Sequence, residues 1–358
     1  MNAIVSAGDR LPPCYGMDSV QTFYSSEEQY GRAAVLILAG AEAVAGLRPA
    51  IGAFASRLDL FSGRNADVLL LVDDNPLWLC DGLAGGVRIV DCGAFLARCG
   101  IGAHDAAVLV IDRNARLASR TDPALAADPV AACLDCLDTL PNEAPRMVCQ
   151  PAPAIMLPNL LPPAMCKDLI GRFERGPAID GEIARIDAAG NSCSVVDHDK
   201  KCRRDMPIDP HEDLHRVLQT LLLARCAPEI AKAFQVQVTH TDRILVSRYD
   251  AGAGWFHRHR DNTADNVAFR QFALSVNLNT GDYQGGFLQF PEYNDHGYEP
   301  PAGGGAIFST AVLHAAAPVT YGHRYVLLTF FHSDAAEIQR QTYLANARQT
   351  VEPQWLGR

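Results

Sequence analysis

The sequence contains little positive charge for its length. Its 358 residues include 31 lysines and arginines against 41 aspartates and glutamates, a formal net charge of −10. Nonspecific binding to nucleic acids or to anionic membranes requires clustered positive charge. We therefore expect neither a nucleic acid nor a membrane among the partners, although a local basic patch would still be able to bind an acidic partner.

Long hydrophobic runs are also absent. No stretch approaches the roughly 20 apolar residues of a membrane-spanning helix. The first residues, MNAIVSAGDRLPPC, lack a basic region followed by a hydrophobic one. We expect a cytoplasmic protein. Apolar residues nevertheless make up 48% of the chain, which is enough for two hydrophobic cores at this length.

The cysteines form no regular framework. There are 11 of them, an odd number scattered along the chain, and this is typical of reduced, mostly buried thiols. Cys133 and Cys136 have the C-x-x-C spacing of redox and zinc sites. The segment around them is rich in alanine and leucine and looks helical, so packing in a helix is favoured over a redox or metal role.

Residues 1–145 are expected to form an α/β domain. Nearly continuous apolar runs at 33–40, 67–74, 87–90 and 106–118 predict strands of a sheet that is covered on both faces, and residues 44–60 have helical spacing. The opening G-D-x-L-P, the strand–helix–strand order and the late I-D-R-N-A-R-L resemble the peroxiredoxin branch of the thioredoxin fold.

That resemblance lacks its reactive thiol. Where the family places the peroxide-reducing cysteine, this chain reads AGAEAVAGL at residues 39–47, and Cys80, Cys92 and Cys99 lie elsewhere. Because fold analogy cannot supply a missing nucleophile, the resemblance implies a degenerate redoxin-like module that serves docking, homodimer formation or substrate presentation. A surviving thiol peroxidase activity is the alternative.

A proline-rich join separates this domain from the next. Seven prolines lie within residues 140–163, which predicts an extended connection. We set the second domain at residues 150–335 and a C-terminal tail at 336–358. Helices at 165–175 and 211–234 are expected to support one face of a sheet. Residues 179–205 are interpreted as a solvated loop, with a substrate-facing lid as the alternative.

Three residues of the second domain have the pattern of metal ligands. His259 and Asp261 form an H-x-D pair in a strand-like segment, where side chains at i and i+2 share a face, and His314 follows from another strand. Two imidazoles and one carboxylate on one face of an octahedron leave three positions open. This is expected for non-haem Fe(II) enzymes that bind a co-substrate and O₂. We interpret all three as catalytic metal ligands rather than structural side chains.

Arg324 follows His314 after a turn predicted at Tyr321 and Gly322. A returning strand would bring its guanidinium near the metal pocket, where the planar fork could bind a carboxylate through two hydrogen bonds. The alternative is a surface arginine that caps the turn.

Several local motifs support this interpretation. They are R-Y-D-A-G at 248–252, H-R-D-N at 259–262, G-G-x-L-x-F at 285–290, F-P-E at 290–292 and P-V-x-x-G-x-R at 318–324. Together they resemble the prolyl 4-hydroxylase-like branch of the Fe(II)/2-oxoglutarate dioxygenases, including the hypoxia-sensing type, over roughly residues 150–335. The resemblance implies a mainly-β double-stranded β-helix, or jelly roll, with supporting helices.

The resemblance also implies roles for individual residues. The metal would be Fe(II), with 2-oxoglutarate and O₂ as co-substrates and ascorbate as a reductant that keeps the iron reduced. Arg324 would bind the distal carboxylate of 2-oxoglutarate. Tyr249 would form a hydrogen bond with the same co-substrate, and packing as a half-buried strand residue is the alternative. Asn277 stands where the hypoxia-sensing type has a second tyrosine. Because Asp261 fills a position that related halogenases leave open for chloride, hydroxylation is favoured over halogenation.

The implied activity is hydroxylation of an unactivated C–H bond. A peptide or protein residue such as proline is the leading substrate, and a free amino acid or small natural-product precursor is the alternative. A non-catalytic metal-binding interaction protein is a further hypothesis from a different class.

Overall fold

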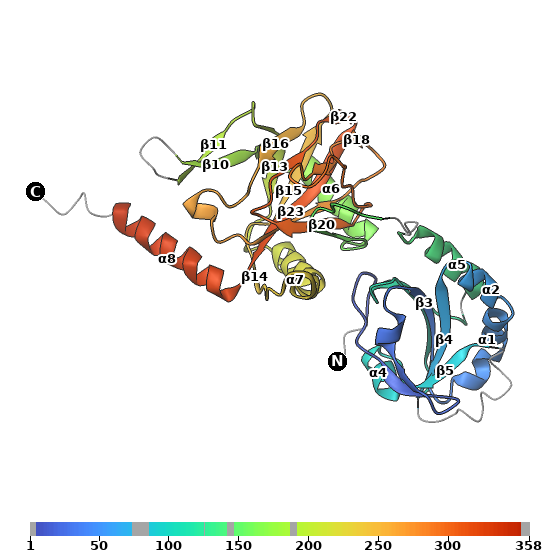
Figure 1. Cartoon of the computed structure of the whole chain (residues 1–358). Helices are drawn as coiled ribbons and strands as arrows, with labels where there is room; N and C mark the ends of the chain where they lie inside the picture. Colours follow the sequence, from blue (N-terminus) through green and yellow to red (C-terminus); the bar gives the residue numbers. More distant parts are fainter. Residues whose placement is uncertain (1–4, 74–85, 125, 142–146, 187–191, 352–358) are drawn as a thin grey trace, which may run out of the picture. The chain divides into compact units, whose positions relative to one another are not determined.

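The computed structural model describes residues 5–73, 86–124, 126–141, 147–186 and 192–351 (Figure 1). The chain divides into two compact units, Met1–Ala144 and Pro145–Arg358. Within the described ranges, none of the helices combines the length and the apolar character that a bilayer span requires.

The first unit is a seven-stranded sheet with helices in its connections. Its strands lie in the order β2-β1-β5-β4-β3-β6-β7. Their bounds are β1 Tyr15–Asp18, β2 Phe23–Ser25, β3 Ala33–Ala39, β4 Ala66–Val72, β5 Arg88–Asp91, β6 Ala106–Ile111 and β7 Leu117–Thr121. The α-helices described are α1 Arg48–Ala55, α2 Leu58–Ser62, α4 Gly93–Arg98 and α5 Pro129–Thr139, with 3₁₀ turns η1 Ser26–Gln29 and η2 Val44–Leu47.

The connectivity of this sheet is thioredoxin-like. Strands β3 and β4 are parallel and joined through α1 and α2, β6 and β7 add to β3 as an antiparallel pair, and α5 follows. Alternate residues of β3 point to opposite faces. Val35 and Ile37 therefore lie in one core cluster and Leu36 and Leu38 in another. The expected α/β fold with a doubly covered sheet is confirmed.

The second unit is built mainly from antiparallel strands. They are β8 Ala154–Leu157, β9 Ile179–Asp180, β10 Glu182–Ile186, β11 Ser192–Val196, β12 Lys201–Cys202, β13 Arg204–Pro207, β14 His240–Thr241, β15 Leu245–Asp250, β16 Trp255–His259, β17 Phe272–Asn277, β18 Gln284–Gly285, β19 Leu288–Gln289, β20 Gly305–Ser309, β21 His314–Ala316, β22 Val319–Tyr321 and β23 His323–His332. The helices are α6 Pro163–Arg175, α7 Asp213–Phe234 and α8 Asp334–Val351, with the 3₁₀ turn η3 Asp265–Val267.

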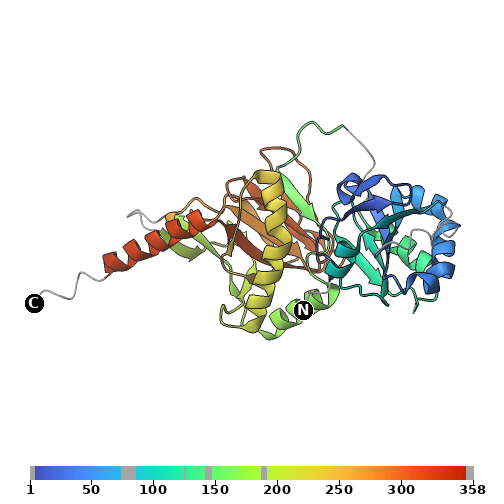
Figure 2. The same ribbon diagram turned by 90° about the horizontal axis from the view of Figure 1, so that it is seen from below.

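Two sheets of this unit enclose the candidate site. The larger has the order β8-β20-β17-β23-β15-β13-β9, with β14 also paired to β23, and the smaller has the order β12-β16-β21-β19. Antiparallel strands in two sheets, one large and one small, confirm the expected jelly roll. Helices α6 and α7 cover the outer face of the large sheet, with α7 lying across it in Figure 2.

The apolar stripe of α7 explains this packing. Leu218, Leu222 and Ile230 are fully buried and share a core cluster with Val246 of β15 and Leu327 of β23. Because side chains alternate along a strand, the neighbours of Val246 and Leu327 point to the inner face of the sheet, toward the smaller sheet. The helices thus fix the outer face and leave the inner face to form the site.

The interpretation of residues 179–205 as a solvated loop is wrong. This segment contains strands β9–β12 and the start of β13, and Lys201 and Asp205 are buried. The charges are stabilised by one another: Arg203 Nε lies 2.8 Å from Asp205 Oδ1, and Ser247 donates a hydrogen bond of 2.5 Å to the same carboxylate. Buried charges of this kind require such partners, which local sequence composition does not reveal.

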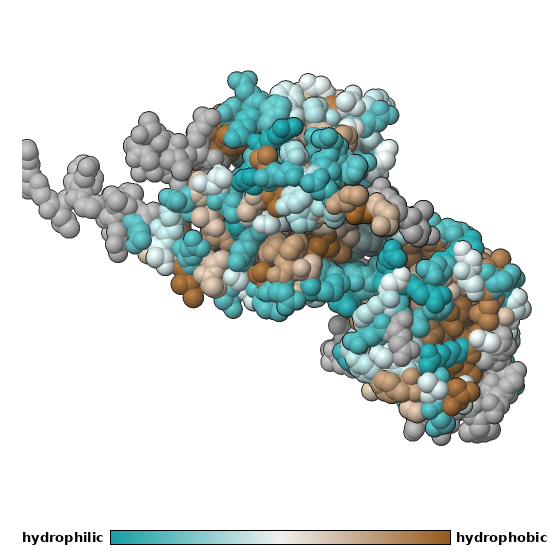
Figure 3. Space-filling view, viewed as in Figure 1, coloured by the Kyte–Doolittle hydropathy of each residue, from teal (hydrophilic) through white to brown (hydrophobic). Residues whose placement is uncertain are grey.

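Hydrophilic residues dominate the surface over β13 and β16 in the view of Figure 3, where hydrophobic atoms lie in small separate patches.

The C-terminal segment, for which the sequence predicts a tail, forms the helix α8 as far as Val351.

Candidate metal centre

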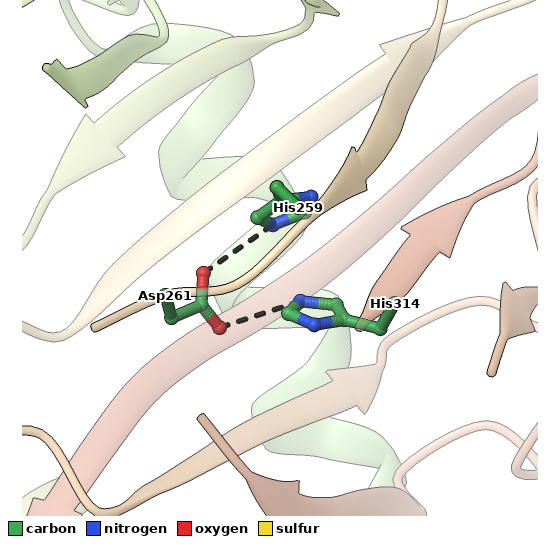
Figure 4. A group of neighbouring side chains, drawn as sticks. All are labelled: His259, Asp261 and His314. Atoms are coloured by element: carbon green, nitrogen blue, oxygen red, sulfur yellow. Dashed lines mark ion pairs between the residues drawn. The ribbon is translucent and has the colours of Figure 1, made fainter. Parts of the chain in front are cut away.

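The three expected ligands lie at facing ends of two paired strands. His259 ends β16, Asp261 follows two residues later, and His314 begins β21. Residues His259 and His314 are direct cross-strand partners. The sheet therefore brings together side chains that are far apart in the sequence, as Figure 4 shows for the three residues.

Their donor atoms converge on one point. The Asp261 carboxylate lies between the imidazoles, with Oδ1 3.3 Å from His259 Nε2 and Oδ2 3.3 Å from His314 Nε2 (Figure 4). One ligand atom from each of the three residues lies within 4.8 Å of the others. This set of two nitrogens and one oxygen fits a divalent transition metal.

Backbone carbonyls orient both imidazoles. His259 Nδ1 lies 2.7 Å from the carbonyl oxygen of His257, and His314 Nδ1 lies 3.0 Å from that of Val312. A ring that donates its Nδ1–H to a carbonyl keeps the Nε2 lone pair for a metal, and such outer contacts fix the ring orientation. Both Nε2 atoms face the carboxylate, so the site is prepared for a cation.

The electrostatics agree with an ionised carboxylate. Burial alone would raise the pKa of Asp261, but the His314 and His259 imidazoles outweigh it and hold that pKa well below its usual range. For His259 burial prevails and lowers the pKa, whereas for His314 the Asp261 carboxylate outweighs burial and raises it. A buried carboxylate between two imidazoles is thus ionised.

The metal ligands line a cavity of about 660 Å³ between the two sheets. Its wall includes Tyr249 and Arg324 from the large sheet and Phe256 from the small one. The Phe256 ring stacks on the His259 ring at a centroid distance of 3.4 Å. The volume is that of a typical small-molecule site, so the cavity has room for a co-substrate beside a metal.

Arg324 is buried in this wall and incompletely satisfied. It is 1% exposed, it donates a hydrogen bond of 2.9 Å from Nη2 to Asn277 Oδ1, and its Nε has no partner within the described part of the chain. Leaving a buried N–H unpaired costs about 1–3 kcal/mol. The guanidinium is therefore suited to an anionic ligand, and the turn-capping alternative does not describe its position.

Tyr249 and Asn277 take different positions around Arg324. Tyr249 is the cross-strand partner of Arg324, whose guanidinium lies 5.3 Å from the tyrosine ring centre. The Tyr249 hydroxyl accepts a hydrogen bond of 2.9 Å from Arg203, which leaves its own proton to donate. Asn277 donates its amide hydrogens to Tyr283 and to the Pro300 carbonyl, so it holds Arg324 in place.

Sequence reasoning missed two groups of cavity residues. Lys201 and Arg203 came from the supposed loop, and Arg340, Tyr343 and Leu344 come from α8. Burial and the Arg203 charge lower the pKa of Lys201 to about 6. Two sequence patterns could have indicated these residues. Charged residues alternate at positions 201, 203 and 205, as in a strand, and the three α8 residues have i, i+3, i+4 spacing. Neither pattern indicates by itself which face is buried.

The thiols of Cys99 and Cys133 in the first unit are poor candidates for catalysis. Burial raises the pKa of Cys99 to about 11 and that of Cys133 to about 12. Cys92 is also buried, and Cys80 lies outside the described residues. A thiol of raised pKa has little nucleophilic thiolate at neutral pH. Cys133 instead packs in the core beside Leu137 on α5.

Comparisons with known proteins found similar chains among the solved structures. No family model and no curated protein matches the chain. Among solved structures, it is similar to a prolyl-4-hydroxylase from Pseudomonas putida, with 20% identity and a TM-score of 0.37 over 57% of this chain and 98% of that chain.

Two further solved structures are similar to this chain. A viral collagen prolyl hydroxylase from Paramecium Bursaria Chlorella virus-1 is similar with 17% identity and a TM-score of 0.37, over 50% of this chain and 96% of that chain. The peroxidoxin BcpB from Mycobacterium tuberculosis is similar with 14% identity and a TM-score of 0.34, over 38% of this chain and 99% of that chain. The reaction has to be inferred from the site itself.

Proposed function

We propose that the second unit is an Fe(II)- and 2-oxoglutarate-dependent dioxygenase that hydroxylates an unactivated C–H bond. A peptide or protein residue such as proline is the leading substrate, and a free amino acid or small natural-product precursor is the alternative. The observation that carries the proposal is the clustering of His259, Asp261 and His314 in one cavity with an incompletely paired Arg324.

The chain's own residues define what the site does. Nε2 of His259, Nε2 of His314 and a carboxylate oxygen of Asp261 would hold the metal on one face and leave the opposite positions open. Bound Fe(II) supplies the redox chemistry that activates O₂, and ascorbate is proposed to keep it reduced. Overall, 2-oxoglutarate, O₂ and the substrate C–H are converted to succinate, CO₂ and C–OH.

Arg324 and Tyr249 orient the co-substrate in this proposal. The guanidinium would bind the distal carboxylate of 2-oxoglutarate, and the Tyr249 hydroxyl would donate to the same group. Val319, Val326 and Ala316 form an apolar cluster beside Tyr249, which keeps water from this end of the cavity. Fixed ligands and restricted water access favour reaction of one oriented C–H bond.

Turnover of 2-oxoglutarate without added substrate tests the proposal. We expect the purified chain to release succinate from 2-oxoglutarate in the presence of Fe(II), O₂ and ascorbate, and to stop when Fe(II) is chelated. Metal binding without succinate release would instead favour the non-catalytic interaction protein. Peroxide consumption with a dithiol reductant would revive the thiol peroxidase alternative.

Gly286 provides a steric test of the Arg324 position. Its φ is +69°, and an added Cβ would lie 2.8 Å from Arg324 Cδ and 2.9 Å from Val319 Cγ2. Gly286→Ala should therefore displace the Arg324 side chain and weaken 2-oxoglutarate binding about tenfold, equivalent to about 1.4 kcal/mol. Metal affinity should change little. Calorimetric titration of both ligands measures the two effects.

Gly281→Ala is the matched control. Gly281 also has a positive φ, +106°, but a Cβ there would meet no atom within 4 Å. Both substitutions place an L-residue at a positive φ, which strains the backbone. Equal losses of 2-oxoglutarate affinity in the two variants would show that strain, not the displacement of Arg324, is the cause.

A further inference from the structure

The cavity extends well beyond Arg324. Strands β15 and β23 contribute two cross-strand pairs on one face to the cavity lining: Tyr249 with Arg324, and Leu245 with Leu328. Phe330 continues this row along β23, and at the rise of a β-strand it lies about 20 Å from Arg324 along the chain. The wall is therefore long enough to hold a second molecule beside a co-substrate at the Arg324 end.

Arg243 lies at the far end of the same row. It stands two residues before Leu245, just outside β15, and it lines the cavity. It belongs to a group of charges that interact with one another. The cations of this group are Lys201, Arg203, Arg243 and Arg270, and the carboxylates are Asp205 and Asp242.

Both carboxylates already have close partners. Arg270 lies 2.8 Å from Asp242 Oδ2 through Nε and 2.6 Å through Nη2. Asp205 is paired with Arg203 and lies 3.7 Å from the Lys201 ammonium. Four cations thus share two carboxylates. These cations extend along the cavity wall from Arg243 to Arg203 beside Tyr249, and this wall carries an excess of positive charge that favours an anion.

Arg243 is the cation left over in this arrangement. Within the described ranges, its guanidinium makes no hydrogen bond or ion pair, and the residue is exposed to solvent. The other arginines that line the cavity each have a polar partner; they are Arg203, Arg260, Arg270, Arg324 and Arg340.

We propose that Arg243 binds a carboxylate of the substrate. The proposal rests on the function proposed above and names the substrate class: a molecule whose carboxylate is held at Arg243 while the C–H bond to be hydroxylated faces the metal ligands. One unpaired planar guanidinium matches one carboxylate through two parallel hydrogen bonds. The carboxylate belongs either to a free amino acid or small acid, or to an acidic residue of a peptide.

The lining of this end fits such a substrate. Tyr343 and Leu344 of α8 and Ile183 of β10 line the cavity together with Arg243. They offer apolar surface in the same cavity as the Arg243 guanidinium. This combination of a largely apolar wall with a few placed polar groups is typical of sites that orient small ligands.

Calorimetric titration of matched acid and amide probes tests the proposal. The full chain is loaded with Mn(II), a redox-inactive substitute for Fe(II), and with 2-oxoglutarate. The small-molecule probes are N-acetyl derivatives of the common amino acids, each as the free acid and as the neutral amide. The peptide probes are pairs of acetyl-Asp-X-amide and acetyl-Asn-X-amide, where X is each of the common amino acids in turn.

We expect at least one acid to bind about tenfold more tightly than its neutral partner. Arg243→Gln should reduce this ratio to about one and leave the affinities for Mn(II) and 2-oxoglutarate unchanged. Arg216→Gln, which removes an exposed charge on α7, should keep the preference. Preference among the N-acetyl acids indicates a small acid, and preference among the dipeptides indicates an acidic peptide residue.

Two outcomes would overturn the inference: no acid preference in any pair, or a preference that persists in Arg243→Gln. These outcomes are distinct from failure of the proposed function. Acid preference without succinate release would leave the anion site standing and refute the dioxygenase. Succinate release without acid preference would refute the role of Arg243 alone.

Discussion

Replacing His314 with alanine is expected to reduce Fe(II) affinity by more than about a hundredfold and to abolish succinate release. Loss of a residue that only supports a metal ligand already costs about 10- to 100-fold in metal affinity, and His314 is proposed as a ligand itself. His314 is 5% exposed and lies between the rings of His259 and Phe308. Its removal deletes one of three donors and leaves the Asp261 carboxylate with a single imidazole partner. Anaerobic calorimetric titration with Fe(II) measures the effect.

Two further variants isolate this effect from misfolding. His314→Gln preserves much of the side-chain volume, and it should also lose the metal if ligation rather than packing matters. His296→Ala removes an exposed histidine of the same unit and should bind Fe(II) like the unmodified chain. A folded His314→Gln protein that retains Fe(II) affinity within about threefold, less than 1 kcal/mol, would refute the assignment of the metal centre.

Replacing Arg324 with alanine is expected to weaken 2-oxoglutarate binding on the order of a hundredfold while Fe(II) affinity changes less than about threefold. Removing one partner of a buried charge-assisted pair costs about 2–5 kcal/mol, and about 1.4 kcal/mol corresponds to tenfold in affinity. Arg324 contacts Asn277 and Tyr249. Within the described part of the chain, it contacts none of the metal ligands. Separate titrations with 2-oxoglutarate and with Fe(II) measure the two affinities.

Arg216→Ala serves as the control for charge removal. Arg216 is a surface residue of α7 whose side chain is 75% exposed, so both affinities should remain as in the unmodified chain. If Arg324→Ala and His314→Ala lose Fe(II) to the same degree, the division between co-substrate binding and metal binding is refuted.

Local pattern predicted much of the second unit. Leucines at three- and four-residue intervals predicted α7, because a helix that covers a sheet needs one apolar stripe. The turn at Tyr321 and Gly322 was predicted correctly, and Gly322 has a φ of +71° that favours glycine. The strand-like H-x-D segment predicted that His259 and Asp261 would lie close together, and they do.

Residues 179–205 illustrate what local pattern does not predict. A basic, polar segment is usually a solvated loop, and here it forms strands whose Lys201 and Asp205 are buried. Their burial depends on Ser247 and Tyr249, which come from β15 and interact with Asp205 and Arg203. Ser247 lies more than forty residues from Asp205 in the sequence, so the periodicity of residues 179–205 does not indicate this partner.

The sequence by itself determined the α/β and jelly-roll classes, the absence of a thiol after the first parallel strand, and the three candidate ligands. The α/β class and the missing thiol depend on residue type and local spacing, whereas the jelly-roll class and the distal ligand His314 followed from the resemblance that the motifs carry. Only the tertiary structure decided that Asn277 holds Arg324, that α8 lines the cavity and that Arg243 has no partner among the described residues. The physical reason is that the pairing of charged groups and the closure of a cavity depend on the register between distant strands, and side-chain contacts across that register have no local signature.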